Sequence, residues 1–314
     1  MVEVIDPRID SLHSLRFHPA VDPWPEGTKG PRADRHLALI RDGAVHARCS
    51  LWWSGTAPHQ GRATCYLGHL AGLDGGCVTE LLSFARRPDL IAAREILGPI
   101  DGNTWHRYRV VTDQGIQPSF PLEPANPEWW PVAFEDAGFQ VVESYWSAVR
   151  DLRRRPVDVP PDAPKGVVVR RLDRARLDEE LDAIYGLAVE AFASNPLYTP
   201  IDLEAFRAMY RPIAYGLDPG LCLIAETDRP VGLMLAIPAH AEHLVLKTIA
   251  VDERMRGKGL GNCLLATIAR YGQDLGFTHL IYALMHESNR SSEMVRRLAE
   301  PMRRYALYGF GGAP

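Results

Sequence analysis

The sequence predicts an α/β (α+β) protein of two domains, each a mixed, mostly antiparallel sheet flanked by helices. Three observations lead to this prediction. The chain has 314 residues, which exceeds the roughly 100 to 200 residues typical of one domain. A proline-rich stretch divides it near the middle. On both sides of that stretch, runs of β-branched and apolar residues indicate strands and alternate with patterns that indicate helices.

The composition narrows the class of protein. Hydrophobic residues make up 46% and charged residues 24% of the chain, which is typical of a globular protein. A net charge of -4 gives no general reason to expect nucleic acid or an anionic membrane as partner. The sequence has no apolar run near the ~20 residues of a membrane helix, and its start does not resemble a signal peptide. Five cysteines without a CxxC pair favour a cytoplasmic protein over a disulfide framework.

The domain boundary is predicted at the stretch RRRPVDVPPDAPK, which has four prolines and no apolar periodicity. Such a composition favours an extended linker. We therefore divide the chain into a first domain of residues 1–152, a linker of residues 153–165 and a second domain of residues 166–314. The three arginines that open the linker are interpreted as solvated rather than as a nucleic-acid patch.

The second domain begins with a predicted strand at residues 167–170. Apolar residues then recur at helical spacing from Leu177 to Phe192. A second helix is expected after Thr199, which has the side chain of a helix cap and is followed by proline at the first helical position. Three strands follow at residues 221–226, 231–237 and 243–251, and we interpret them as an antiparallel meander.

The end of the second domain repeats the alternation of helix and strand. Apolar residues between Leu260 and Leu275 mark one face of a helix that Gly276 would end. A strand at residues 280–285, a short helix between residues 291 and 300 and a final strand at residues 303–308 complete the predicted order.

The segment DERMRGKGLG, residues 252–261, lies between a predicted strand and a predicted helix. At a helix start several N–H groups lack partners and the helix dipole is positive, so a phosphate oxygen can bind there. Arg254, Arg256 and Lys258 add positive charge suited to phosphates. The glycine spacing fits neither the Walker loop nor the dinucleotide fingerprint. We therefore predict a site for another phosphate-bearing ligand.

Residues 251–265, VDERMRGKGLGNCLL, resemble the signature of the GNAT superfamily of N-acetyltransferases. The family's Q/R-x-x-G-x-G/A element corresponds to Arg256, Gly259 and Gly261. The resemblance extends over roughly residues 167–310 and implies transfer of an acyl group from acetyl-CoA to an amine acceptor. One departure is Glu253, where the family commonly has proline, and we expect it to affect loop rigidity more than phosphate contact.

The resemblance also implies which residues contact the cofactor. The backbone of Ile249 and Val251 would pair with the pantetheine arm, and the amides of residues 256–261 would hold the pyrophosphate. Asn289 falls where the family often has an asparagine that touches the cofactor, and Ser292 would assist it. The complete expected set is Ile249, Ala250, Val251, Arg256, Gly257, Lys258, Gly259, Leu260, Gly261, Asn289 and Ser292.

The first domain resembles a degenerate copy of the second. Predicted strands at residues 36–40, 44–53 and 63–70 repeat the meander, and residues 126–139 resemble the Asn-helix-Gly-Phe ending common in GNAT domains. The segment after the third strand has no arginine or lysine until Arg86, so its phosphate site is predicted to be lost. We expect this domain to cover the acceptor cleft or brace the second domain.

The catalytic residues are less well specified by the sequence. The superfamily usually protonates the leaving thiolate with a phenol on the helix after the asparagine, but residues 291–297 contain no tyrosine. Tyr305 and Tyr308 on the last strand therefore become the candidates. For the amine proton the candidate is Glu287, with His286 and a chain of water molecules as alternatives.

The acceptor is expected near residues 193–202, where Tyr198 could shape its site. Lys247, on the strand beside the pantetheine, could bind an acidic group of the acceptor or simply be solvated. The pair His240 and His243 lacks the helical spacing of a metal site, so no metal is expected. The acceptor amine stays open between small molecules and proteins, although a covering domain favours a small molecule.

Two other functions are compatible with this sequence. The missing helix tyrosine would suit a non-catalytic acyl-CoA-binding or sensor protein. Two paired GNAT-like domains could also form a structural scaffold with no affinity for CoA. The intact residues 256–261 favour the enzyme. The oligomeric state is left open.

Overall fold

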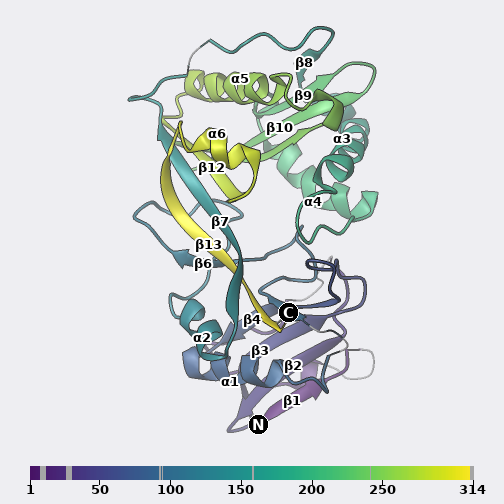
Figure 1. Ribbon diagram of the computed structural model, residues 1–314, viewed down its shortest axis with the longest axis vertical. Helices are drawn as coiled ribbons and strands as arrows, with labels where there is room; N and C mark the ends of the chain where they lie inside the picture. Colours follow the sequence, from purple (N-terminus) through teal and green to yellow (C-terminus); the bar gives the residue numbers. More distant parts are fainter. Residues whose placement is uncertain are drawn as a thin grey trace.

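The protein forms two lobes joined by long strands (Figure 1). The computed structural model describes residues 1–7, 12–25, 30–91, 93, 95–157, 159–240 and 242–311. Each lobe has its own hydrophobic core. Within the described residues, no helix has the length and apolar character needed to cross a membrane.

The N-terminal lobe is a sheet covered by two helices. Strands β2, β3 and β4 form the predicted antiparallel meander, β1 extends it at one edge, and β5 pairs parallel with β4. The elements are β1 (Val2–Ile5), the 3-10 helix η1 (Leu12–Ser14), β2 (Arg35–Arg41), β3 (Ala44–Trp52), β4 (Thr64–Gly72), α1 (Gly75–Ala85), β5 (Glu95–Gly98), β6 (Val110–Asp113), α2 (Trp130–Asp136) and β7 (Gln140–Asp151).

The C-terminal lobe has the predicted order of elements, and its antiparallel meander β9-β10-β11 is confirmed. Helices α3 and α4 pack against each other on one side of the lobe (Figure 1). Helix α5 packs against strands β9, β10 and β11. The elements are β8 (Val168–Arg171), η2 (Arg174–Arg176), α3 (Leu177–Phe192), α4 (Leu203–Gly216), η3 (Pro219–Leu221), β9 (Cys222–Glu226), β10 (Pro230–Ala239), β11 (His243–Val251), η4 (Glu253–Met255), α5 (Leu260–Asp274), β12 (His279–His286), α6 (Arg290–Val295) and β13 (Glu300–Gly311).

One cap differs from the prediction. Helix α4 begins at Leu203, and Asp202 caps it by accepting a hydrogen bond from the Ala205 N–H at 2.7 Å. The Thr199 carbonyl instead accepts a bond from the indole N–H of Trp105 at 2.9 Å. The Asp202 carboxylate therefore caps the helix, and Thr199 instead contacts the N-terminal half through its backbone carbonyl.

The two lobes share one continuous sheet. Its order is β1-β2-β3-β4-β5-β13-β7-β12-β11-β10-β9-β8, and β6 also pairs with β13. Strand β7, which ends the N-terminal half, pairs with β12 of the C-terminal lobe. Strand β13, at the other end of the chain, pairs with β5 of the N-terminal lobe. Each half of the chain therefore contributes a strand that pairs with the sheet of the other half. The predicted domain boundary at residues 153–165 stays a prediction.

Candidate active site

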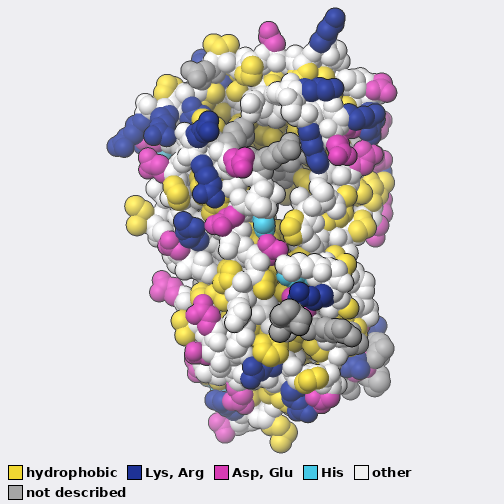
Figure 2. Space-filling view, viewed as in Figure 1, with side chains coloured by type: hydrophobic (Ala, Val, Ile, Leu, Met, Phe, Trp, Pro, Cys, Tyr) yellow, Lys and Arg dark blue, Asp and Glu magenta, His cyan; other side chains and the backbone are white. Residues whose placement is uncertain are grey.

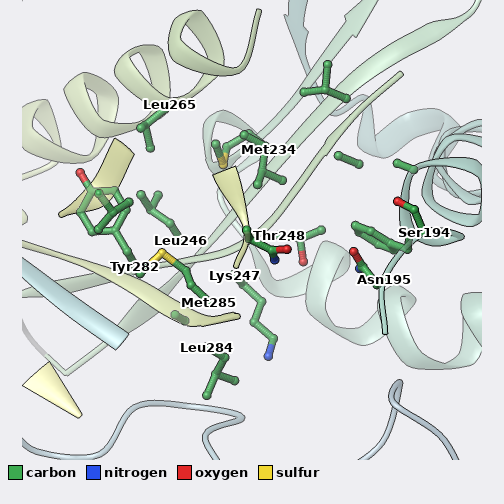
Figure 3. Close-up of a pocket in the computed structure, with 18 of the residues that line it drawn as sticks. Ser194, Asn195, Met234, Leu246, Lys247, Thr248, Leu265, Tyr282, Leu284 and Met285 are labelled. Carbon is green, nitrogen blue, oxygen red and sulfur yellow. The ribbon is translucent and has the colours of Figure 1, made fainter. Parts of the chain in front are cut away.

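A cleft opens in the C-terminal lobe where β11 and β12 diverge. The two strands pair in parallel only from His243 to Leu246 on β11 and from His279 to Tyr282 on β12. Beyond these residues they separate around a cavity of about 770 Å³. Figure 3 shows the apolar side chains of Met234, Leu246, Leu265, Tyr282 and Met285 on one side of this pocket and Ser194 and Asn195 on the other.

In the part of β11 that has separated from β12, the backbone groups of two residues face the cleft. The Asp252 N–H bonds to the Val231 carbonyl of β10 at 2.9 Å, and Val251 lies opposite Gly232 in the same register. Because successive residues of an antiparallel strand bond to opposite sides, the N–H and C=O groups of Ile249 and Val251 point away from β10. These groups are thus free to bind an extended polar chain in the cleft.

The cleft ends at the start of α5. Gly259 is the N-cap at φ 84° and Gly257 has φ 78°, a region that favours glycine. A Cβ placed at either position would meet no atom within 4 Å, so the space above the loop is open. With glycine as the cap, no side chain occupies the first N–H groups of the helix. A phosphate fits this arrangement of open space, free N–H groups and positive dipole.

Asp252 holds the loop that precedes α5. Its carboxylate accepts bonds from Arg229 at 2.6 Å, from Arg254 at 3.0 and 3.1 Å and from the Arg254 N–H at 2.9 Å. The Arg254 hydrogen bond is the largest cause that lowers the pKa of Asp252 to about 2. This pairing leaves Arg256, which lines the cleft, and exposed Lys258 as the cations nearest the α5 start along the chain.

We expect Asp252→Asn to lower the free energy of unfolding at pH 7 by about 1–3 kcal/mol, since it removes a charged acceptor from buried bonds. The native pKa near 2 lies below the usual value of about 4, so the ionised carboxylate stabilises the protein above pH 4 and stops doing so as the pH falls toward 2. Urea unfolding should therefore give wild type and variant stabilities that converge over this range. Asp162→Asn, at an exposed position, is the control, and a difference independent of pH would contradict the assignment.

The equivalent helix start in the N-terminal lobe is closed. The side chain of Asp74 caps α1 and accepts a bond from the Cys77 N–H at 2.8 Å. A carboxylate in this place both occupies a first-turn N–H and repels an anion. The start of α1 is therefore unsuited to a phosphate, in contrast to the start of α5.

A second cavity of about 660 Å³ adjoins the cleft. The two share six lining residues, among them Asn195, Lys247 and Leu284. The N-terminal half contributes part of its wall through residues 104–109 and 122–124. Trp105 fixes this wall by packing between the rings of Phe192, Tyr198 and Phe206, at centroid distances of 5.9–6.0 Å. The N-terminal half thus covers this cavity beside the cleft.

Most of the predicted cofactor residues lie together. Ile249, Ala250, Val251, Arg256 and Asn289 line the cleft. Gly257, Lys258, Gly259, Leu260 and Gly261 form the loop and helix start at its end. The exception is Ser292, which is buried and whose hydroxyl accepts a bond from the Trp146 indole N–H at 2.7 Å. Ser292 therefore positions α6 against β7 and is not among the residues that line the cleft.

The structure does not bring the predicted catalytic tyrosines to the cleft. Tyr305 is 1% exposed, its hydroxyl donates to Glu123 and it lies 2.9 Å from the Ser147 hydroxyl. Tyr308 belongs to the N-terminal core, where it stacks on Phe134 and bonds to Glu135 at 3.1 Å. The shared sheet is the reason, because β13 runs away from the C-terminal lobe toward β5.

The remaining predicted residues lie at or near the cavities. Glu287 is exposed and forms an ion pair with Arg304 at 3.4 Å, without lining either cavity. Tyr198 lines the second cavity, and its hydroxyl is buried without a partner. Lys247 lines both cavities. No group of three or more His, Cys, Asp or Glu side chains in the described part of the chain is placed to hold a metal.

Sequence reasoning missed two residues of the second cavity, Arg109 and Glu123, which come from the N-terminal half. Neither belongs to a motif, and no spacing in the sequence links them to the C-terminal lobe. The neighbouring segment at residues 98–106 has two glycines and one tryptophan, a composition that suits a loop facing a ligand or an ordinary turn equally well.

The fold and the cleft between diverging parallel strands can be compared with known proteins. Residues 181–298 match the model of the acetyltransferase (GNAT) family. Residues 181–298 therefore form a GNAT domain, and the N-terminal half has the fold of the same tandem arrangement.

Solved structures support the fold over nearly the whole chain. A GCN5-related N-acetyltransferase from Sphaerobacter thermophilus is 18% identical with a TM-score of 0.54, covering 92% of this chain and 84% of that one. A tandem GNAT protein from the clavulanic acid biosynthesis pathway is 15% identical with a TM-score of 0.52, covering 89% and 83%. A search of curated proteins found no match.

The charges on the molecular surface are mixed. On the face shown in Figure 2, acidic and basic side chains are interspersed over both lobes. Neither sign covers this face as one continuous area.

Proposed function

We propose that this protein is an acetyl-CoA-dependent N-acetyltransferase that moves an acyl group from CoA to a primary amine of a small molecule. The observation that carries the proposal is the cleft between β11 and β12, which ends at the glycine-bounded start of α5. It offers backbone partners for an extended arm and N–H groups for phosphates.

The residues of the cleft suit direct transfer. Acyl transfer needs an amine held near the thioester and donors for the oxyanion that develops. The N–H groups that β11 turns toward the cleft can supply such donors. The adjoining cavity, covered by the N-terminal lobe, would hold the amine and limit its size.

The amine proton has candidate acceptors near the end of β12. His286 lies 2.6 Å from the Glu143 carboxylate of β7, and its other ring nitrogen faces the Ser288 hydroxyl at 2.7 Å. This hydrogen-bonded chain reaches Ser288, which lines the cleft. We propose it as a proton route beside the exposed carboxylate of Glu287, with water completing the path.

A thiol-release assay tests the proposal. We expect acetyl-CoA to bind, and free CoA to appear in the presence of an amine but not of the corresponding alcohol, because only the amine is a competent nucleophile here. Mass spectrometry of the product should show the added acetyl group. Absence of acetyl-CoA binding would contradict the proposal and favour a scaffold.

A non-catalytic acyl-CoA-binding or sensor protein is the alternative. The position of Tyr305 and Tyr308 away from the cleft favours it, since neither phenol can protonate a thiolate there. This alternative predicts that acetyl-CoA binds but that no tested amine is acetylated.

A further inference from the structure

We propose that the acceptor carries a carboxylate, which Lys247 and Arg109 bind in the cavity beneath the N-terminal lobe. The acceptor would then resemble an amino acid, with an amine directed to the cleft and a carboxylate held behind it. This inference rests on the proposed function, because that function defines the acceptor. The binding of a carboxylate can nevertheless be tested without turnover.

Lys247 occupies an irregular position on β11. The register with β10 shifts there, because Thr248 lies opposite Leu235 while Leu246 lies opposite Ala236. The extra residue is Lys247, as expected of a β-bulge that redirects a side chain. Figure 3 shows this side chain extending away from Met234 and Leu265 toward the side of the pocket where Leu284 lies. The ammonium group is therefore directed out of the strand and into the cavities.

Lys247 has no ion-pair partner among the residues that the structure describes. Burial lowers the pKa of its ammonium to about 8, and the charge of Arg109 contributes to this lowering. A half-buried ammonium group that lies near a second cation is electrostatically unfavourable by itself. A bound anion would remove this penalty.

Arg109 is the second cation. It is 7% exposed, and its guanidinium lies 3.8 Å from the ring centroid of Tyr108 and 4.0 Å from that of Tyr145. Burial lowers the pKa of Arg109 to about 10, and its Nε has no hydrogen-bond partner. Buried arginines are normally paired with a carboxylate. In the described structure the partners of Arg109 are aromatic rings and tyrosine hydroxyl groups.

Glu123 lines the same cavity but does not neutralise these cations. Its carboxylate forms a buried ion pair with Arg303 at 2.6 Å and accepts bonds from the Phe120 N–H at 3.1 Å and from Tyr305. The charge of Glu123 is thus already balanced. The buried Arg109 and the half-buried Lys247, which line this cavity together with the exposed Arg107, thus have no carboxylate counter-charge among the described residues.

The geometry points to a carboxylate rather than a larger anion. Arg109 has aromatic rings against its guanidinium, which leaves N–H groups at the edge of the plane, and Lys247 supplies a point charge from another element. Two donors of this kind match the two oxygens of a carboxylate. The cavity of about 660 Å³ is within the range that holds small molecules.

The test compares N-acetyl amino acids with their methyl esters, pairs that differ only in the carboxylate. Binding is measured by isothermal titration, with and without CoA, on the full chain. We expect at least one acid to bind roughly 10- to 100-fold more tightly than its ester, the range of one charged hydrogen bond. Lys247→Met should remove about tenfold or more of this preference, Lys247→Arg should retain most of it, and exposed Lys165→Met should change nothing.

The inference would be overturned if acids and esters bound alike, if none of the tested acids bound, or if Lys247→Met weakened both members of a pair equally. Binding of inorganic phosphate but of no carboxylate would also overturn it. Acetyl-CoA titration on the same wild-type preparation reports separately on the proposed function. Failure of one ligand can thus be distinguished from failure of the other.

Discussion

Gly259→Glu should weaken acetyl-CoA binding by at least about 100-fold, which corresponds to roughly 2.8 kcal/mol. Gly259 caps α5 at φ 84° with open space above it. A glutamate there would place a carboxylate where the phosphates are expected and would strain a left-handed backbone position. Isothermal titration of wild type and variant with acetyl-CoA measures the effect.

The chain offers a matched control for this substitution. Gly166 has φ 81°, and a Cβ at this position would have no neighbouring atom within 4 Å. It lies two residues before β8 along the chain and does not line the cleft. Gly166→Glu introduces the same strain and charge, and it should leave acetyl-CoA binding unchanged. Equal losses in both variants would show that global strain, rather than the anion site, is responsible.

Arg303→Met should lower the free energy of unfolding by about 3–5 kcal/mol, because it leaves a buried carboxylate unpaired. Arg303 and Glu123 have side chains 4% and 3% exposed and lie 2.6 Å apart. Arg303 also donates to the carbonyls of Gln114 at 2.8 Å and Gln117 at 2.6 Å. Urea unfolding followed by circular dichroism gives the loss.

The neighbouring Arg304 provides the comparison. Its side chain is 59% exposed and lies 3.4 Å from Glu287, so Arg304→Met should cost no more than about 1 kcal/mol. The double variant Arg303→Met with Glu123→Gln should be more stable than Arg303→Met alone, since it removes the unpaired charge. An Arg303→Met variant as stable as Arg304→Met would contradict the role given to the buried pair.

The local patterns of the sequence were sufficient for most of the fold. Periodicity located the strands of both meanders and helices α3 and α5, because apolar spacing reports which face an element buries. The position of the α5 loop followed from its glycines and cations between a strand and a helix. The cap of α4 was misplaced by three residues, since Thr199 and Asp202 both have side chains that cap helices.

The sharing of strands between the lobes could not be read from the sequence. Nothing in the apolar pattern of residues 140–151 or 300–311 states which sheet they join, because pairing between distant strands is decided by tertiary packing. The candidate tyrosines depended on that choice, and so did Arg109 and Glu123, which reach the second cavity only through the contact between the lobes. The sequence therefore predicted the position of the loop between β11 and α5, but it did not predict which residues long-range topology brings to the second cavity.

The position of β13 in the sheet has a consequence for biosynthesis. Strand β13 follows every other described strand along the chain, yet it pairs with β5 and β7 of the N-terminal half. Until residues 300–311 have left the ribosome, strands β5 and β7 each have an edge that lacks its partner β13. Exposed edges of this kind invite wrong pairing, so the first half of a nascent chain would depend on timely completion of the second, or on a chaperone, to avoid aggregation.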